Sequence, residues 1–189
     1  MVDLNTGMAR RVLEGSQYTS PEDIDMVIDN HTVTLGGNPA RVGVNPITID
    51  NQHEWVYFAP MTGTSLYRVR TKDLLNHTLS DKALAKKVQR YGDKPISDGI
   101  TMDSAGNVYV TAITQNSIGV TRPNGKYETL YQDKTISWPD GFAVGPNNSV
   151  YFTVNELHRS PVLNKGKDDS TGQFAIYRFN AHAPAKVGR

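Results

Sequence analysis

The sequence predicts an all-β protein built from repeated units of short antiparallel strands, and three observations support this class. The 189 residues include 16 Gly and 10 Pro, spread along the chain in short turn-like groups. Between those groups lie nine Tyr and many Val, Ile and Thr, residue types that favour strands over long helices. Finally, three segments of the chain repeat one pattern in the same order.

Each repeat opens with an Asn or Asp residue before a short apolar strand, and a strand containing Val-Tyr returns after a polar turn. The openings are Asn45, Asp98 and Asp140, which lie 53 and 42 residues apart. Blades of a β-propeller repeat every 40 to 50 residues or so, with four strands in each blade. We therefore predict a partial β-propeller of about three blades of four-stranded antiparallel sheet, in a single domain over residues 1–180.

The longer first interval has a cause in the sequence. Residues 71–92 predict a short helical insertion, with Ser80 as the N-cap, Leu84 and Val88 on one face, and Gly92 as the C-terminal stop. Such an insertion lengthens one blade without changing its core. Residues 181–189 follow the last predicted strand and are expected to form a flexible C-terminal tail.

A second repeat concerns outer strands. Residues 2–13 match residues 120–131 at a constant offset of 118, with the same Asn-x-Gly or Asn-Gly turn region between two strand segments. The chain is thus expected to begin in the outer hairpin of a blade. Three blades leave two open ends, so either the chain belongs to a longer protein, which we favour, or two copies self-associate into a ring, or the ends stay exposed.

Composition and charge exclude several functions. The chain has 20 basic and 19 acidic residues with no run of one sign, which argues against nucleic acid as a partner. It has no cysteine, and no stretch approaches the roughly 18 apolar residues of a membrane-spanning helix. The first five residues are polar, so we predict no signal peptide in this chain and no membrane partner.

The three residues that open the inner strands are the first candidate site. Inner strands of a propeller surround one axis, so Asn45, Asp98 and Asp140 should converge near one end of it. Two carboxylates and an amide form an oxygen-rich set suited to Ca²⁺ or another divalent cation, or to a small ligand. The alternative is that these residues only form turns, bonding to nearby backbone N–H groups.

The last inner hairpin provides a second group of candidates. Asn155 offers paired donor and acceptor atoms, Glu156 a negative charge for an amine, and Trp138 a flat face for an aromatic ligand. His158 is the candidate general base, because its ordinary pKa suits that role. The alternative is that Trp138 packs between blades and that the charged residues pair at the surface.

These segments resemble the major royal jelly protein and Yellow family, in a member of bacterial type. The resemblance rests on Gly43–Asp50, Val56–Gly63, Leu66–Val69, Ile96–Ile100, Trp138–Phe142 and Thr153–Arg159, which appear in order through most of residues 1–180. It implies a six-bladed propeller of which this chain is the C-terminal half, and an extracellular or periplasmic location. Family members include proteins that bind biogenic amines. One departure is Val154-Asn155-Glu156, where members often have Ser-Asn-Arg.

The leading hypothesis is a small-ligand-binding propeller, its ligand an aromatic amine or catechol, with Asn45, Asp98, Asp140, Asn155 and His158 lining an axial pocket. The alternative is a metal-dependent lactonase-like hydrolase, because gluconolactonase and regucalcin propellers are similar in placing Asn and Asp residues around a divalent metal. A third hypothesis is an inactive scaffold. Whether the chain is an enzyme stays open at this stage.

Overall fold

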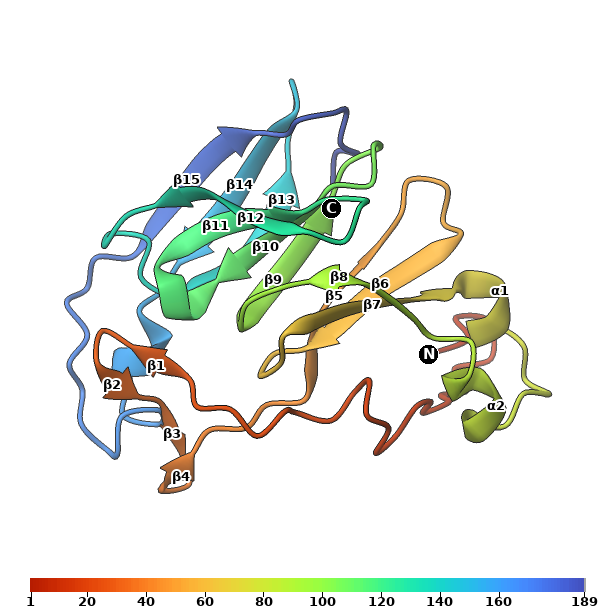
Figure 1. Cartoon of the computed structure of the whole chain (residues 1–189), viewed down its shortest axis with the longest axis horizontal. Coiled ribbons are helices and arrows are strands. Elements are labelled where there is room, and N and C mark those ends of the chain that lie inside the picture. Colours follow the sequence, from red (N-terminus) through yellow and green to blue (C-terminus); the bar gives the residue numbers. More distant parts are fainter. Residues whose placement is uncertain (189) are drawn as a thin grey trace.

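The computed structural model describes residues 1–188 and shows three antiparallel sheets arranged side by side as blades (Figure 1). We name them blades A, B and C in chain order. Blade A comprises β5 (Val44–Ile49), β6 (Trp55–Pro60), β7 (Ser65–Arg70) and β8 (Gln89–Asp93). Blade B comprises β9 (Ser97–Met102), β10 (Val108–Ala112), β11 (Ser117–Thr121) and β12 (Tyr127–Gln132). Blade C comprises β13 (Pro139–Val144), β14 (Ser149–Val154) and β15 (Ala175–Asn180). The predicted partial propeller is confirmed.

The inner strands of the three blades are neighbours, with β9 packed between β5 and β13. Two cores fill the spaces between blades. One lies between blades A and B around Tyr57 and Val110, and the other lies between blades B and C around Tyr109 and Phe152. Gly99 allows β9 and β13 to approach closely, because a Cβ at this position would lie 2.3 Å from the backbone oxygen of Asp140.

The helical insertion is shorter than the sequence predicts. The structure has α1 (Thr71–Leu74) and α2 (Asp81–Ala85), with the Ser80 hydroxyl accepting a 3.3 Å bond from the Ala83 N–H and Leu84 fully buried. Gly92 does not end a helix, because residues 89–93 form β8 and pair with β7. The backbone groups of β7 need a partner on their outer side, and this requirement overrides the helical pattern.

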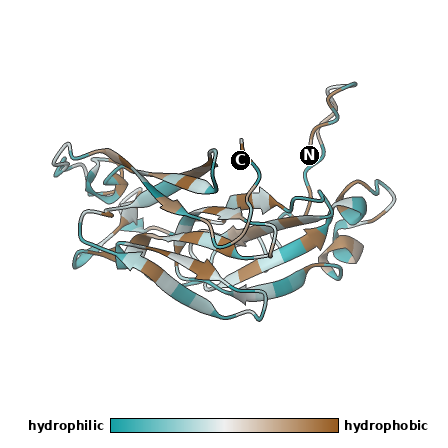
Figure 2. Cartoon of the chain, turned by 90° about the horizontal axis from the view of Figure 1, so that it is seen from above, coloured by the Kyte–Doolittle hydropathy of each residue, from teal (hydrophilic) through white to brown (hydrophobic). Residues whose placement is uncertain are grey.

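The N-terminal segment forms the start of a hairpin. Val2 bridges Ala9, and the Asp3 N–H bonds to the Met8 carbonyl at 2.9 Å. This hairpin leaves the body of the sheets (Figure 2). Beyond it the chain is fixed to blade A, since the Arg10 guanidinium donates to the carbonyls of Asn76 and Leu79, and Leu13 is buried against the outer face of the blade.

Two short ribbons cover the end of the blades where the inner strands begin. They are β1 (Val27–Ile28) with β2 (His31–Thr32), and β3 (Thr34–Leu35) with β4 (Asn38–Pro39). Together with the loop of residues 157–174, they lie below blades B and C in Figure 1. Their buried side chains join Met61, Ile96, Ile113 and Trp138 in one core. We call residues 26–40 the cap.

The prediction of a flexible tail is wrong for residues 181–188, which are hydrogen-bonded to the opposite end of the blades. The Ala181 N–H donates to the Asn148 carbonyl in blade C, and the Ala183 N–H donates to Asp103 in blade B. Lys186 Nζ lies 3.0 Å from the ring of His53 in blade A. The tail therefore contacts the turn between the first two strands of every blade. Arg189 lies outside the described residues.

Within residues 1–188, neither α-helix has the length and apolar character needed to cross a lipid bilayer.

Candidate functional site

The structure brings together the three residues that open the inner strands. Asn45 at the start of β5 donates a hydrogen bond from Nδ2 to Oδ1 of Asp98 at the start of β9. Asp98 is in turn close enough to Asp140, at the start of β13, for the Asp140 charge to raise the pKa of Asp98. The repeated opening residues thus lie on three adjacent strands at one end of the axis.

Trp138 and Asn155 complete this group. The indole Nε1 of Trp138 donates to Oδ2 of Asp98 at 2.7 Å, and Asn155 Nδ2 donates to Oδ2 of Asp140 at 2.8 Å. Each carboxylate therefore has a neutral donor that fixes its orientation. We call Asn45, Asp98, Trp138, Asp140 and Asn155 the axial cluster.

The two carboxylates have unusual electrostatics. Burial raises the pKa of Asp98 to about 6, and the nearby Asp140 charge adds to this effect, while the bonds from Trp138 and Asn45 oppose it. Burial also raises the pKa of Asp140. Among residues 1–188, no Lys, Arg or His forms an ion pair with either carboxylate. The axial cluster therefore contains an acidic pair that has no cation partner among the described residues.

The backbone that carries Asp98 is held by Thr111 on β10. The Thr111 hydroxyl accepts bonds from the N–H groups of Asp98 at 3.2 Å and Gly99 at 2.7 Å, and it donates to the Gly99 carbonyl. These contacts occur at a shift in the β9–β10 register. Sequence reasoning missed Thr111, because nothing in the pattern distinguishes it from other strand threonines.

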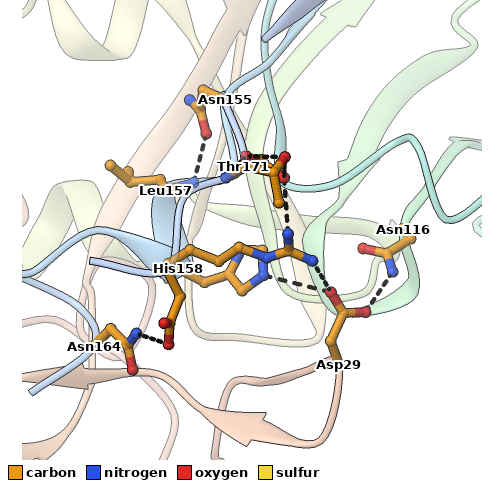
Figure 3. Close-up of polar contacts among 10 residues, drawn as sticks. Asp29, Asn116, Asn155, Leu157, His158, Asn164 and Thr171 are labelled. Carbon is orange, nitrogen blue, oxygen red and sulfur yellow. Dashed lines mark hydrogen bonds and ion pairs between the residues drawn. The ribbon is translucent and has the colours of Figure 1, made fainter. Parts of the chain in front are cut away.

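Glu156 and His158 belong to a separate group near the cap (Figure 3). Both oxygens of Glu156 are used, since Oε1 accepts a 2.9 Å bond from Arg159 and both accept from the Thr171 hydroxyl. Arg159 also donates to Asp29 in the turn between β1 and β2 at 3.2 Å. Glu156 is buried and already paired, so it is not a free anion for an amine as the sequence suggested.

His158 is 1% exposed and stacks on Trp138, with 6.1 Å between ring centres and 5° between ring planes. Burial and the Arg159 charge lower its pKa, and its Nε2 lies 3.5 Å from Asp29 Oδ2. It contacts the axial cluster only through Trp138. The structure therefore corrects two predicted roles: His158 is not placed to act as a general base, and Trp138, also 1% exposed, offers no open face for stacking.

The arrangement does not fit a resident divalent metal. Asn45 presents its amide nitrogen to Asp98, and both Asp98 oxygens already accept hydrogen bonds. The residues described include no group of three or more His, Asp or Glu side chains spaced to hold a metal ion. Three of the four carboxylate oxygens of the axial cluster thus already accept hydrogen bonds from the cluster's own donors.

Sequence reasoning also missed two charged residues near this end of the blades. Lys94 is buried, and its Nζ donates to the carbonyls of Gly63 at 2.8 Å and Pro95 at 3.0 Å. Asp29 links the cap to the 157–174 loop and, through Asn116, to blade B. No sequence pattern marks either residue, because the contacts of each come from segments that are distant in the chain.

Blades that share an axis, with polar residues opening every inner strand, define this chain as an incomplete β-propeller. The family model described as "Major royal jelly protein" matches residues 1–183. The chain therefore belongs to the major royal jelly protein family. No curated protein sequence matches it.

Solved structures support the fold. A luciferin-regenerating enzyme has a TM-score of 0.51 and 16% identity, over 86% of this chain and 53% of its own. A protein assigned as a gluconolactonase has a TM-score of 0.50 and 10% identity, over 91% and 52% respectively. This chain spans about half the length of these proteins, and the likeness concerns the fold alone.

Proposed function

We propose that this chain binds a small organic amine at the axial cluster, with Asp98 and Asp140 as the residues that recognise its positive charge. The observation that carries this proposal is the acidic pair itself. Two half-buried carboxylates lie on adjacent blades, the charge of Asp140 raises the pKa of Asp98, and no basic residue among residues 1–188 forms an ion pair with either.

Two negative charges that are close together and partly removed from water raise the free energy of the folded chain. A carboxylate removed from water beside a second carboxylate favours a cation partner, which lowers the energy of both. Asp140 Oδ2 is bonded to Asn155, whereas its Oδ1 has no hydrogen-bond partner within residues 1–188. A primary ammonium group has three donors, enough to bond Oδ1 and the second acceptor positions of Asp98.

The ligand proposed here is defined only by its amine, whereas the sequence predicts an aromatic amine or a catechol. Trp138 is buried under the cap, so it orients Asp98 and does not stack on a ligand ring. The amine end of the ligand is therefore the part assigned to this chain. A catechol without an amine brings no positive charge to the carboxylates, and we do not include it.

Isothermal titration calorimetry with tyramine tests this function. We expect tyramine to bind, and 4-ethylphenol, which has the same ring without the amine, to bind at least tenfold more weakly. Asp98→Asn and Asp140→Asn should each weaken tyramine binding at least tenfold, which corresponds to about 1.4 kcal/mol. Asp133→Asn is the matched control: Asp133 is an exposed carboxylate outside the axial cluster, and its replacement should leave binding unchanged.

Equal binding of tyramine by the wild type and by Asp98→Asn would contradict the proposal. The same titration with CaCl₂, followed by a lactone hydrolysis assay with and without chelator, tests the metal-dependent alternative. Binding of Ca²⁺ that Asp98→Asn abolishes would favour that alternative. A chain that melts cooperatively and binds neither probe would be a scaffold.

A further inference from the structure

A polar pocket lies beside the cap, and none of the five residues of the axial cluster lines it. It has a volume of about 320 Å³, at the small end of the range for sites that hold small molecules. Its wall comes from Asp29 in the cap, from residues 134–137 between β12 and β13, and from residues 156–173. We call it the cap pocket.

Ser137 is a buried polar residue in the wall of the cap pocket. It is 4% exposed, and its hydroxyl has no hydrogen-bond partner among residues 1–188. The backbone of Ser137 is fixed, because its carbonyl accepts a 3.2 Å bond from the Glu156 N–H. A buried hydroxyl without a partner is costly, so a ligand that bonds to it is favoured.

Three charged residues of the wall form a network with one excess negative charge. Arg159 donates to Oε1 of Glu156 at 2.9 Å and to Oδ2 of Asp29 at 3.2 Å. Thr171 bonds to both oxygens of Glu156 through its N–H and its hydroxyl (Figure 3). Two carboxylates therefore share one guanidinium group, and the oxygens of Glu156 are already used.

Asp29 is the carboxylate of this network that a ligand can reach. Its side chain is 39% exposed, against 5% for Glu156. Burial alone would raise the pKa of Asp29, but bonds from Asn116 and Arg159 outweigh this effect and lower the pKa, so the carboxylate is ionised at neutral pH. Its Oδ1 accepts a bond from Asn116 at 2.9 Å, and a carboxylate oxygen can accept a second.

Lys134 provides the opposite charge in the same wall. Its ammonium group forms no ion pair with any acid of the described chain, including Asp29. An ammonium group has three donors. The cap pocket therefore combines an unpaired cation with a network that carries one excess negative charge.

We propose that the cap pocket binds a small free amino acid in its zwitterionic form. The ligand carboxylate accepts bonds from Lys134 and from the Ser137 hydroxyl, and the ligand ammonium group donates to Oδ1 of Asp29. The charges of the wall balance, and a zwitterion keeps that balance while it pairs with both signs. An acid or an amine alone would leave one charge of the wall unmatched.

Three probes with the same carbon skeleton test the class of ligand by isothermal titration calorimetry. L-Alanine carries both charges, propionate lacks the ammonium group, and ethylamine lacks the carboxylate. We expect L-alanine to bind, and the other two probes to bind at least about tenfold more weakly. The proposal is overturned if L-alanine does not bind, or if either of the other probes binds equally well.

Ser137→Ala and Lys134→Met test the assigned residues. Each should weaken the binding of L-alanine at least about tenfold, with an unchanged circular dichroism spectrum. Ser149→Ala and Lys126→Met are the matched controls and should leave this binding unchanged. Ser149 is also 4% exposed but lies at the start of β14, and Lys126 is an exposed lysine between β11 and β12. Lys134 is exposed, so an unchanged affinity in folded Lys134→Met would contradict the assignment.

Competition with tyramine separates the cap pocket from the axial cluster. The affinity for L-alanine should be the same with and without saturating tyramine, because no residue of the axial cluster lines the cap pocket. Displacement of L-alanine by tyramine would place both ligands in one site and overturn the proposal. The titrations of L-alanine alone do not depend on whether tyramine binds.

Discussion

Trp138 and Asp98 lie on adjacent blades, and the indole N–H bonds to the carboxylate at 2.7 Å while the Trp138 backbone has a φ of 50°. Bulky residues rarely adopt this left-handed conformation. The surrounding structure therefore holds a strained residue in place. His158 stacks on the indole ring and the cap packs against it, so the 157–174 loop and the cap both support the orientation of Asp98.

Trp138→Phe removes this bond while keeping an aromatic ring. The pKa of Asp98 should rise further, because the indole bond stabilises the ionised carboxylate. The free energy of unfolding should fall by about 1–3 kcal/mol, the cost of an unpaired buried group. Carboxyl NMR titration and urea unfolding measure the two effects. Trp55→Phe in blade A is the control, and an unchanged Asp98 pKa in Trp138→Phe would show that the bond has no role.

The pH dependence of stability should carry the signature of Asp98. Its pKa in the folded chain is about 6, above the ordinary value of 3.8. Between these values the folded state binds more protons than the unfolded state, so the free energy of unfolding falls as the pH rises from 3.8 to 6. Asp98→Asn should remove this fall.

Thermal melts of the wild type and Asp98→Asn from pH 3.5 to pH 7.5, roughly the span over which Asp98 titrates, measure the difference in Tm between them. The Tm of Asp98→Asn, relative to the wild type, should increase between pH 4 and pH 6, approximately the two pKa values, and then stay constant. Asp133→Asn should show no such increase, because the Asp133 carboxylate is exposed and lacks the burial that raises the pKa of Asp98. A Tm difference for Asp98→Asn that is constant across this range would contradict the assignment.

Gly99 and Gly141 follow Asp98 and Asp140 at the same position of the repeat, but their replacement by Ala should have effects of different size on stability. Gly99→Ala forces a Cβ against the Asp140 carbonyl and should cost about 1–3 kcal/mol, as overpacked cores do. A Cβ at Gly141 would meet no atom of residues 1–188 within 4 Å, so Gly141→Ala should change the free energy of unfolding by less than about 1 kcal/mol. Urea denaturation compares them directly, and equal effects would mean that β9 and β13 are not in this contact.

Lys94 should make the chain more stable in mild alkali. Burial lowers its pKa to about 7, from an ordinary value of 10.5. Between these values the unfolded state binds more protons, so the free energy of unfolding increases with pH from about 7 to 10. Lys94→Met should abolish the increase, whereas the exposed Lys134→Met should keep it. Urea unfolding at several pH values measures it, and an identical slope in Lys94→Met would show that another group is responsible.

The strand-rich architecture was predictable because each blade repeats the same local chemistry. The repeat placed Asn45, Asp98 and Asp140 at one end of the axis without any knowledge of long-range contacts. The helix at Ser80 was predictable for the same reason, since an N-cap acts within one turn. The strand at residues 89–93 was not, because its pairing with β7 depends on an edge that the local pattern does not show.

The roles of individual site residues were less predictable than their positions. Trp138, Glu156 and His158 have side chains suited to ligand chemistry, but all three are buried by the cap or the 157–174 loop. One partner of this loop, Asp29, lies more than a hundred residues away in the sequence. Burial by a distant segment changes a binding group into a structural one, and a single sequence without relatives carries no sign of it.

The C-terminal segment, residues 181–188, holds the three blades together at the end opposite to the axial cluster. Residues 181–188 contact the first turn of every blade, at the end of the inner strands opposite to the axial cluster. Rotating one blade relative to the others would break its contact with this segment. The segment therefore restrains rotation of the three blades relative to one another, and with it the spacing of Asn45, Asp98 and Asp140 at the other end of the inner strands.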